Sequence, residues 1–281
     1  MIQARQVTAG TGARWLVSGW QMLRAQPALW LGMAVVYLVL AMLLEQIPFI
    51  GWLILLLVTP VVLLGALPLA HGQMEDNLPA SAVAPAPTAR DLRIRETWRA
   101  WALYLRDLLR RSAGHLFAGF QSERRLLPVM VVSTLLLGGV IVLRILAALL
   151  KAGSSLHAML LGSVTPSVWL PDLVATLLIL TLLVMLIMTV LYTIPLILFR
   201  GAHPLPAFES SFFAARQNLG AFLILAGSFL LLAAAARALF FFFAFPLDYL
   251  AFLVIGLIAL PVLVGALYAS YRDLFAKRAN G

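Results

Sequence analysis

Six long apolar runs constrain this chain of 281 residues more than any other feature of its sequence. At 1.5 Å per residue, each run is long enough to cross roughly 30 Å of hydrocarbon as a helix. A strand of a membrane barrel would alternate apolar and polar residues, and these runs do not. The sequence therefore predicts an all-α polytopic membrane bundle with six transmembrane helices. We place the runs at Ala28–Glu45, Phe49–Ala70, Leu126–Leu150, Asp172–Phe199, Gly220–Phe243 and Asp248–Tyr271.

The composition also indicates a lipid environment. Apolar residues make up 63% of the chain and charged residues 11%, whereas soluble domains contain about half and about a quarter. A soluble fold could not bury this much apolar surface. The chain has no cysteine, which excludes disulfides, thiolate nucleophiles and cysteine-based metal sites.

Lys and Arg are concentrated on alternate connections between the runs. Seventeen of the 20 basic residues lie before the first run, between the second and third runs, between the fourth and fifth runs, or after the sixth run. The other three are Arg144, Lys151 and Arg237. Because positively charged connections stay in the cytoplasm, we expect a multi-pass protein of the bacterial inner (plasma) membrane with both termini cytoplasmic. The net charge of +9 then predicts contact with anionic membrane lipids and no binding of nucleic acid. The seven tryptophans fall near the ends of the runs, where we expect them to be half exposed.

The connection between the second and third runs is the only long polar segment. It contains a stretch rich in Pro, Ala and Ser at Leu78–Ala89, which is typical of a linker. From Trp98 onward, apolar residues recur at helical spacing while arginines fall on the other faces. This pattern fits an amphipathic helix on the inner leaflet, and equally a cytoplasmic helix packed against the bundle.

A short pattern recurs before the first, third and fifth runs. A pair of small residues precedes an aromatic residue, and an arginine follows the aromatic four places later. On a helix this spacing puts the aromatic and the arginine on one face, where the ring can lie at the headgroup boundary and the guanidinium can reach a phosphate. We predict interfacial lipid contacts at these aromatic and arginine pairs: Trp20 with Arg24, Phe120 with Arg124, and Phe212 with Arg216.

The second, fourth and sixth runs also resemble one another. Each contains a proline, Pro60, Pro195 or Pro261, and then a Gly-Ala pair. Proline predicts a kink, and the small pair allows close helix approach. The pattern predicts three parallel helix-hairpin repeats with interfacial helices, with chance similarity between leucine-rich runs as the alternative. It divides the chain into 1–70 (interfacial helix and hairpin 1–2), 71–97 (cytoplasmic linker), 98–200 (amphipathic helix and hairpin 3–4) and 201–281 (interfacial helix, hairpin 5–6 and tail).

Several of these motifs resemble an uncharacterised family of bacterial six-span inner-membrane proteins. They are Trp15, Gly19-Trp20, Arg24, Pro27, Ile47–Gly51, Thr59-Pro60 and Leu116–Phe120, and the resemblance covers nearly the whole chain. More distantly, the layout is similar to the membrane domain fused to some bacterial glycerophosphodiester phosphodiesterases. That second similarity is architectural, and this sequence contains no soluble phosphodiesterase barrel, so it does not imply hydrolase activity.

No catalytic constellation is recognisable in the sequence. The histidines His71, His115, His157 and His203 lie on separate connections without ligand spacing, so we predict no metal, no cofactor and no enzyme activity.

Three charged residues inside the runs stand out. Glu45, Arg144 and Arg237 lie 17 or 18 residues after the start of the first, third and fifth runs, at a depth of about 26 Å. Charges near the outer edge of the hydrocarbon are costly unless they pair, line a cavity or snorkel to water. The three residues therefore predict either a polar layer facing the bundle interior or side chains that reach the outer aqueous phase.

Two classes of function fit these observations. The first is a non-catalytic membrane scaffold or accessory protein in contact with anionic lipid, with a membrane protein or a second copy of the chain as a further partner. The alternative is a transporter or lipid-handling permease that uses the polar layer. A water-accessible cavity lined by the three charged residues would favour transport, and a solid bundle with interfacial helices would favour scaffolding.

Overall fold

The structure is a computed structural model that describes residues 2–48, 50–75, 94–161, 166–243 and 247–275. Within these ranges, the side chains of residues 94–100, 123, 151–161, 166–172, 236–243 and 247–254 lie outside the description. Every secondary-structure element in the described ranges is helical, which confirms the predicted all-α class. The elements are α1 (Thr11–Ala25), α2 (Pro27–Glu45), α3 (Gly51–Glu75), α4 (Ile94–Phe117), the short 3₁₀ helix η1 (Ala118–Gln121), α5 (Glu123–Leu161), α6 (Pro166–Val190), α7 (Thr193–Arg200), α8 (Pro204–Gln217), α9 (Leu219–Phe243) and α10 (Leu247–Phe275).

Five described stretches are long and apolar enough to cross a membrane, and a sixth is reached if α8 and α9 count as one bent pair. The five lie in α2, α3, α5, α6 with α7, and α10. Between α8 and α9 the chain turns by 85° at Asn218. The six predicted runs overlap these helices, and the fourth run extends across α6 and α7.

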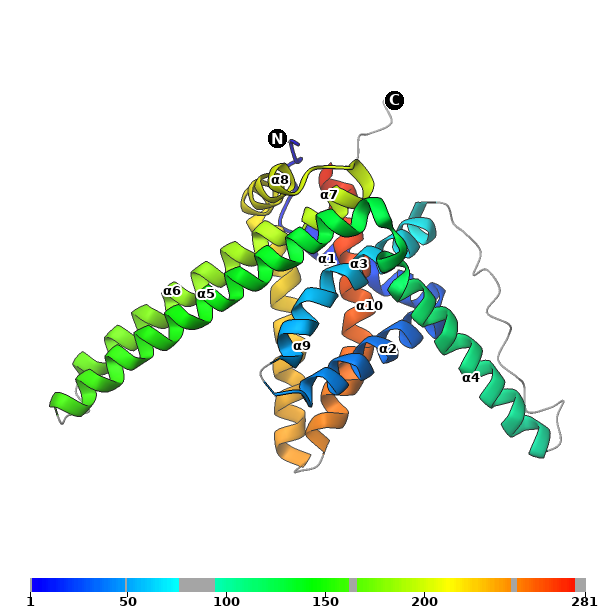
Figure 1. The fold of residues 1–281 in the computed structure, drawn as a ribbon, viewed down its shortest axis with the longest axis horizontal. Helices are drawn as coiled ribbons and strands as arrows, with labels where there is room; N and C mark the ends of the chain where they lie inside the picture. Colours follow the sequence, from blue (N-terminus) through cyan, green and yellow to red (C-terminus); the bar gives the residue numbers. More distant parts are fainter. Residues whose placement is uncertain (1, 49, 76–93, 162–165, 244–246, 276–281) are drawn as a thin grey trace.

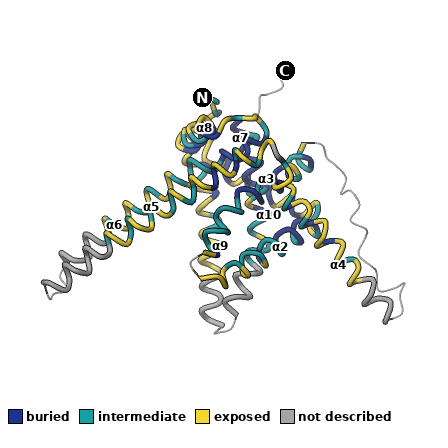
Figure 2. Tube along the Cα trace, in the orientation of Figure 1, coloured by how far each residue is buried: buried dark blue, intermediate teal, exposed yellow. Residues whose placement is uncertain are grey.

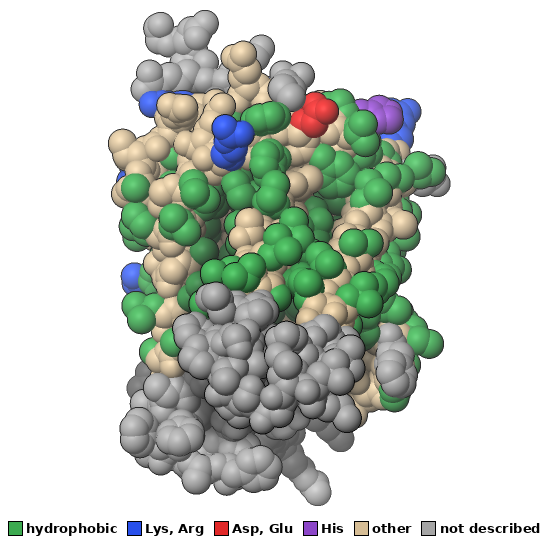
Figure 3. Space-filling model, turned by 90° about the vertical axis from the view of Figure 1, so that its left-hand side faces the viewer, with side chains coloured by type: hydrophobic (Ala, Val, Ile, Leu, Met, Phe, Trp, Pro, Cys, Tyr) green, Lys and Arg blue, Asp and Glu red, His purple; other side chains and the backbone are tan. Residues whose placement is uncertain are grey.

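Three helical hairpins diverge from a common region (Figure 1). They are α2–α3, α5–α6 and α9–α10, and the α5–α6 hairpin and α4 leave this region toward opposite sides of the view. The described start of the chain and the end of α10 lie together, as the hydrogen bond from the Arg5 N–H to the Leu274 carbonyl shows. We call this end of the molecule the charged end because His71, Glu75, Arg200 and Arg272 gather there. On the face shown in Figure 3, most charged side chains lie at this end and the surface below is apolar.

Burial is concentrated where the hairpins meet (Figure 2). A cluster of buried apolar residues there, which we call the hub, includes Trp15, Trp30, Leu67, Leu196 and Tyr268. About half of the residues in the Ile255–Phe275 stretch of α10 are buried, whereas none of the residues Leu173–Val190 of α6 is. Helix α7, which continues the fourth run, is buried from Thr193 to Leu198. The hairpins are therefore held together at one end, and the described part of α5–α6 beyond it is mostly exposed or half exposed.

Two tryptophans depart from the prediction that the indoles are half exposed. Trp15 and Trp30 are each only 1% exposed. The Trp15 Nε1 donates a hydrogen bond to Asp273 Oδ2 at 2.9 Å, and the Trp30 Nε1 donates to Gln73 Oε1 at 2.8 Å. Because an acceptor from a distant helix satisfies each indole N–H, these rings can lie inside the hub.

Small residues bring three short segments against three long helices. A side chain at Gly19 of α1 would collide with the Val262 carbonyl of α10, and one at Gly119 of η1 would collide with the Val61 carbonyl of α3. In α8 the equivalent position is Ser211. Its Oγ donates to the Met188 carbonyl at 2.7 Å and accepts from the Tyr192 N–H at 2.9 Å. Each segment thus packs on the second helix of a hairpin. η1 packs on α3 and α8 packs on α6, in each case the hairpin just before it in the chain. α1 packs on α10 of the last hairpin, which makes the order of contacts cyclic.

The register of these contacts corrects one predicted equivalence. Val262 directly follows Pro261, and Val61 directly follows Pro60. Met188, the corresponding residue of the third contact, instead precedes Pro195 by seven positions. Pro195 therefore does not occupy the place of Pro60 and Pro261.

The three predicted kinks differ in helix continuity. α3 and α10 run unbroken through Pro60 and Pro261. The fourth run is interrupted at Leu191–Tyr192, between α6 and α7. Proline has no N–H to donate to the carbonyl four residues earlier, which for Pro195 belongs to Leu191. The break therefore falls where the backbone ladder loses a donor.

The N-terminal segment closes the cyclic order of packing. The Val7 N–H donates to Asn218 Oδ1 at 2.7 Å, and Asn218 Nδ2 donates to the Arg5 carbonyl at 3.0 Å. The Arg5 N–H in turn donates to the Leu274 carbonyl at 2.9 Å. The start of the chain is thereby fixed to the α8–α9 bend and to the end of α10.

Candidate functional site

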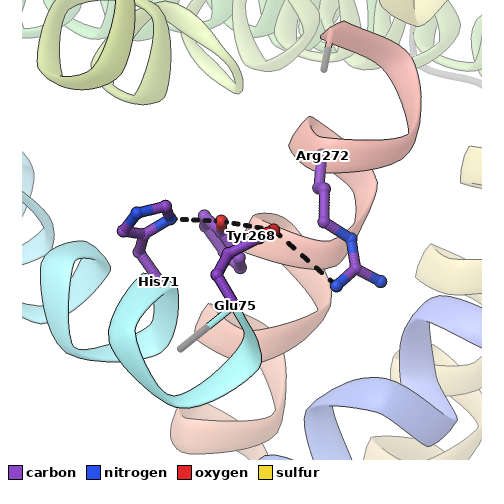
Figure 4. A network of polar contacts seen from close by, with 4 residues as sticks. All are labelled: His71, Glu75, Tyr268 and Arg272. Atoms are coloured by element: carbon purple, nitrogen blue, oxygen red, sulfur yellow. Dashed lines mark hydrogen bonds and ion pairs between the residues drawn. The ribbon is translucent and has the colours of Figure 1, made fainter. Parts of the chain in front are cut away.

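A polar network joins the ends of α3 and α10 at the charged end (Figure 4). His71 Nδ1 lies 2.5 Å from the Tyr268 hydroxyl, which donates to Glu75 Oε1 at 3.1 Å. Glu75 also faces Arg272 Nη1 at 3.8 Å. Because Tyr268 donates to Glu75, it accepts from His71 only if the imidazole carries its proton on Nδ1. The network therefore fixes the two helix ends with one connected set of hydrogen bonds.

Aromatic rings extend this network to α7. Phe199 lies 5.2 Å from His71, 5.6 Å from Tyr268 and 5.4 Å from Tyr271 between ring centroids. The Arg200 guanidinium donates to the carbonyl of Phe275, the last residue of α10. The second helices of all three hairpins thus end in one polar and aromatic cluster. Its groups are used in contacts between helices, which is the arrangement of a structural joint.

An apolar groove lies next to the hub, where the three hairpins begin to diverge. Its volume is about 330 Å³. The only paired hydroxyls in its lining belong to Tyr37 and Thr59, which are 2.9 Å apart, and Thr59 donates to the Leu55 carbonyl at 2.6 Å. The lining includes Trp30 and Ala34 of α2, Pro60 and Leu63 of α3, Leu136 of α5, Ile187 of α6, Ile194 of α7 and Val264 of α10.

A second recess lies on the other side of α3. It has a volume of about 390 Å³ and is lined by His115, Ser122 and Arg125 together with Gly65 and Gly119. The His115 and Arg125 side chains are exposed. The recess therefore presents a cation and two polar groups at the surface, and no buried polar group is directed into it from the residues that line it.

The predicted polar layer is not assembled among the described residues. Glu45 and Arg144 are both exposed, and no ion pair joins them in the described part of the chain. The Arg144 guanidinium instead lies over the Trp52 ring, 4.7 Å from its centroid. The side chain of Arg237 lies outside the described residues. For Arg144, the contact with an indole fits a side chain that reaches outward better than one that lines a cavity.

The six predicted lipid contacts all lie on the surface. Gly19, Gly119 and Ser211 are buried against their partner helices. The aromatic residue that follows each of them is exposed or half exposed, and the arginine four places further on is exposed: Trp20 and Arg24, Phe120 and Arg124, and Phe212 and Arg216. The small residue therefore faces the protein while the aromatic and the arginine are available to the surroundings.

Helix α4 combines the two arrangements considered from its sequence. Leu108, Ser112 and Leu116 are buried, and the Ser112 Oγ donates to the Leu29 carbonyl of α2 at 3.5 Å. Trp101 and Leu105 belong to the same apolar stripe one or two turns earlier, and they are exposed. The second half of α4 packs on the bundle, and the described part of its first half leaves its apolar stripe uncovered.

Sequence reasoning missed the network at the charged end. The sequence pattern tests only whether His71 has the spacing of a metal ligand, whereas its partner is a tyrosine on another helix. A usable indication is the spacing of polar residues in the last turns of two runs: His71 and Glu75 in one, Tyr268 and Arg272 in the other, each four residues apart and so on one helix face. Among the described residues, no group of three His, Asp or Glu side chains could hold a metal ion.

No family model, curated protein or solved structure matches this chain.

Proposed function

We propose that this chain is a non-catalytic scaffold or accessory protein of a bacterial inner membrane, belonging to the six-span family that its motifs resemble. It would hold anionic lipid at its charged end and present its hairpins to a membrane partner or to a second copy of itself. The observation that carries the proposal is the divergence of three apolar hairpins from one packed hub. None of the residues Leu173–Val190 of α6 is buried, so this part of α6 is open to lipid or to another protein.

The proposed orientation places the charged end in the cytoplasm. Arg24, Arg124 and Arg216 are exposed and belong to segments next to the hub. Connections rich in Arg stay on the cytoplasmic side, and exposed arginines there attract anionic headgroups. Both termini would then be cytoplasmic.

The three cyclic contacts support the proposal that the chain is built from three repeats. Gly12 of α1 packs on the Ala221 carbonyl of α9, and Ser112 of α4 packs on the Leu29 carbonyl of α2. Each of these residues lies seven positions before the small residue that contacts the second helix of the same hairpin, Gly19 or Gly119. Helix α1, and α4 together with η1, thus each contact both helices of one hairpin in the same register, which chance similarity between leucine-rich runs does not explain.

The permease alternative has less support. A transport site usually lies near the middle of the membrane and carries polar groups for its substrate. The groove next to the hub is apolar, and the described members of the predicted polar layer do not line it. From the sequence, a cavity lined by the three charged residues would favour transport and a solid bundle would favour scaffolding. The described charged residues do not line the groove, and the hairpins diverge rather than pack as a solid bundle, so neither condition is met in full.

The proposal is tested with the purified full-length chain in proteoliposomes. Native mass spectrometry should show retained phosphatidylglycerol in preference to phosphatidylcholine. A variant with Arg24, Arg124 and Arg216 changed to Gln should lose most of this preference, whereas Arg106→Gln, an exposed arginine of α4 outside the three motifs, should keep it. Translocation of a fluorescent phospholipid should equal that of protein-free vesicles. A protein-dependent rate that falls in Arg144→Gln would replace the scaffold with the permease.

A further inference from the structure

The groove next to the hub is closed on one side by buried residues and bordered on another by exposed ones. Its walls come from all three hairpins. Trp30 and Leu116, which are buried, close it toward the hub. Ile187 of α6 and Leu263 of α10 are 51% and 44% exposed, so the groove opens sideways between the diverging hairpins. A molecule in the surrounding medium can therefore enter it without any movement of the helices.

Water is a poor occupant of this groove. A buried water needs two to four polar partners. Among the lining residues, the hydroxyls of Tyr37 and Thr59 bond to each other, and Thr59 also donates to the Leu55 carbonyl. The remaining side chains of the lining are apolar apart from the indole of Trp30, whose N–H is bonded to Gln73. Little hydrogen-bonding capacity is left for water.

An empty groove is also unfavourable, because lining atoms without neighbours lose their dispersion contacts. The occupant that remains is hydrocarbon. In the proposed membrane location the medium at the opening consists of lipid chains. A flexible chain suits a volume of about 330 Å³ better than a helix about 10 Å wide. The charge-free lining excludes a headgroup from the same space.

We propose that the groove is a binding site for one acyl chain of a membrane phospholipid. The inference rests on the proposed membrane function and deepens it, because a chain held between the hairpins would fill the space that their divergence opens. The site would be distinct from the surface contacts of the three arginines, which meet headgroups. It would select for the apolar chain and leave the headgroup at the entrance.

The test uses a phospholipid with a photoactivatable diazirine in its acyl chain, in nanodiscs that hold the full-length protein. Cross-linked positions are mapped by peptide mass spectrometry. Labelling of Leu63 and Val264 should exceed that of Leu178, an exposed residue on the α6 arm, by several-fold relative to exposed area. Two variants fill the groove from different helices, Val264→Trp from α10 and Leu63→Trp from α3. Each should reduce labelling of the other groove residue several-fold.

Val184→Trp is the matched control, since the same substitution on the exposed face of α6 should leave groove labelling unchanged. Equal labelling of groove and arm, or groove labelling that survives both filling variants, would overturn the proposal. If Leu178 of α6 is not labelled either, the chain does not lie in the membrane and the proposed function fails. If Leu178 is labelled and the groove is not, only the acyl-chain site fails.

Discussion

The α5–α6 hairpin and α10 have similar apolar sequences but different surroundings. Most of the described α5–α6 side chains are exposed or half exposed, whereas α10 is half buried and lies under α1. The difference follows from small residues. Gly265 of α10 lies against Gly19 of α1, so the two backbones touch, while Gly138 of α5 has no atom near the place where its Cβ would be. Apolar composition therefore makes a helix suited to a membrane, and small residues at matching positions decide which helices pack.

The largest predicted effect breaks this packing directly. In Gly19→Leu the new side chain would collide with the Val262 carbonyl, and the free energy of unfolding should fall by about 3 kcal/mol or more. The measurement is an unfolding titration with sodium dodecyl sulfate in mixed micelles. Gly138→Leu is the control, because its side chain would enter open space and the helix gains from losing a glycine. Equal losses in both variants would contradict the role given to the Gly19 contact.

Ser211 sharpens the comparison, because it makes the equivalent contact with a hydroxyl. Ser211→Ala removes the acceptor of the buried Tyr192 N–H and the donor to the Met188 carbonyl, and it should cost about 2 kcal/mol in the same titration. Ser228→Ala removes a hydroxyl that bonds only within α9, to the Ile224 carbonyl, on the exposed face. It should change the free energy of unfolding by much less. A similar result for both serines would mean that α8 is not held on α6 by this residue.

The network at the charged end should have a smaller effect. Tyr268→Phe removes the hydroxyl that connects His71 to Glu75 and should lower the free energy of unfolding by about 1 kcal/mol. Tyr192→Phe is the matched control. The buried Tyr192 hydroxyl lies near Ser270 but forms no well-aligned hydrogen bond in the described part of the chain, so its removal should cost less than removal of the Tyr268 hydroxyl. A larger loss in Tyr192→Phe than in Tyr268→Phe would refute this account of the joint.

The sequence predicts the spans well because hydropathy is a local property. Each of the six runs overlaps a helix. The residues predicted to contact lipid, among them Trp20, Phe120 and Arg216, lie on the surface, and their contact with lipid stays a prediction. The divergence of the hairpins could not be predicted, since lipid-facing and protein-facing leucines are equally apolar. The acceptors of Trp15 and Trp30 lie far away in sequence, so neither burial nor pairing shows in the local pattern.

The register of the repeats is the instructive error. Pro195 resembles Pro60 because both precede a Gly-Ala pair, but the contact of Ser211 with Met188 and Tyr192 gives a different alignment. Gly119 lies against the Val61 carbonyl and the Gly65 N–H, as Ser211 lies against the Met188 carbonyl and the Tyr192 N–H. Pro68 follows Gly65 by three positions and Pro195 follows Tyr192 by three, so Pro68 is the counterpart of Pro195. Contacts between backbones define that register, and a match of residue types within leucine-rich helices is too weak to find it.

The smallest predicted effect concerns the contact between Arg144, near the middle of α5, and Trp52, at the start of α3, which stands in place of the predicted charge pair. Arg144→Gln should lower the free energy of unfolding by about 0.5 kcal/mol, because an exposed cation over an indole contributes little. In Trp52→Leu the same Arg144 substitution should have no further effect, since the two residues act as a pair. If Arg144→Gln costs several times more, and costs as much in the Trp52→Leu background, the guanidinium has a partner other than the ring. The polar layer formed with Glu45 and Arg237 would then regain its support.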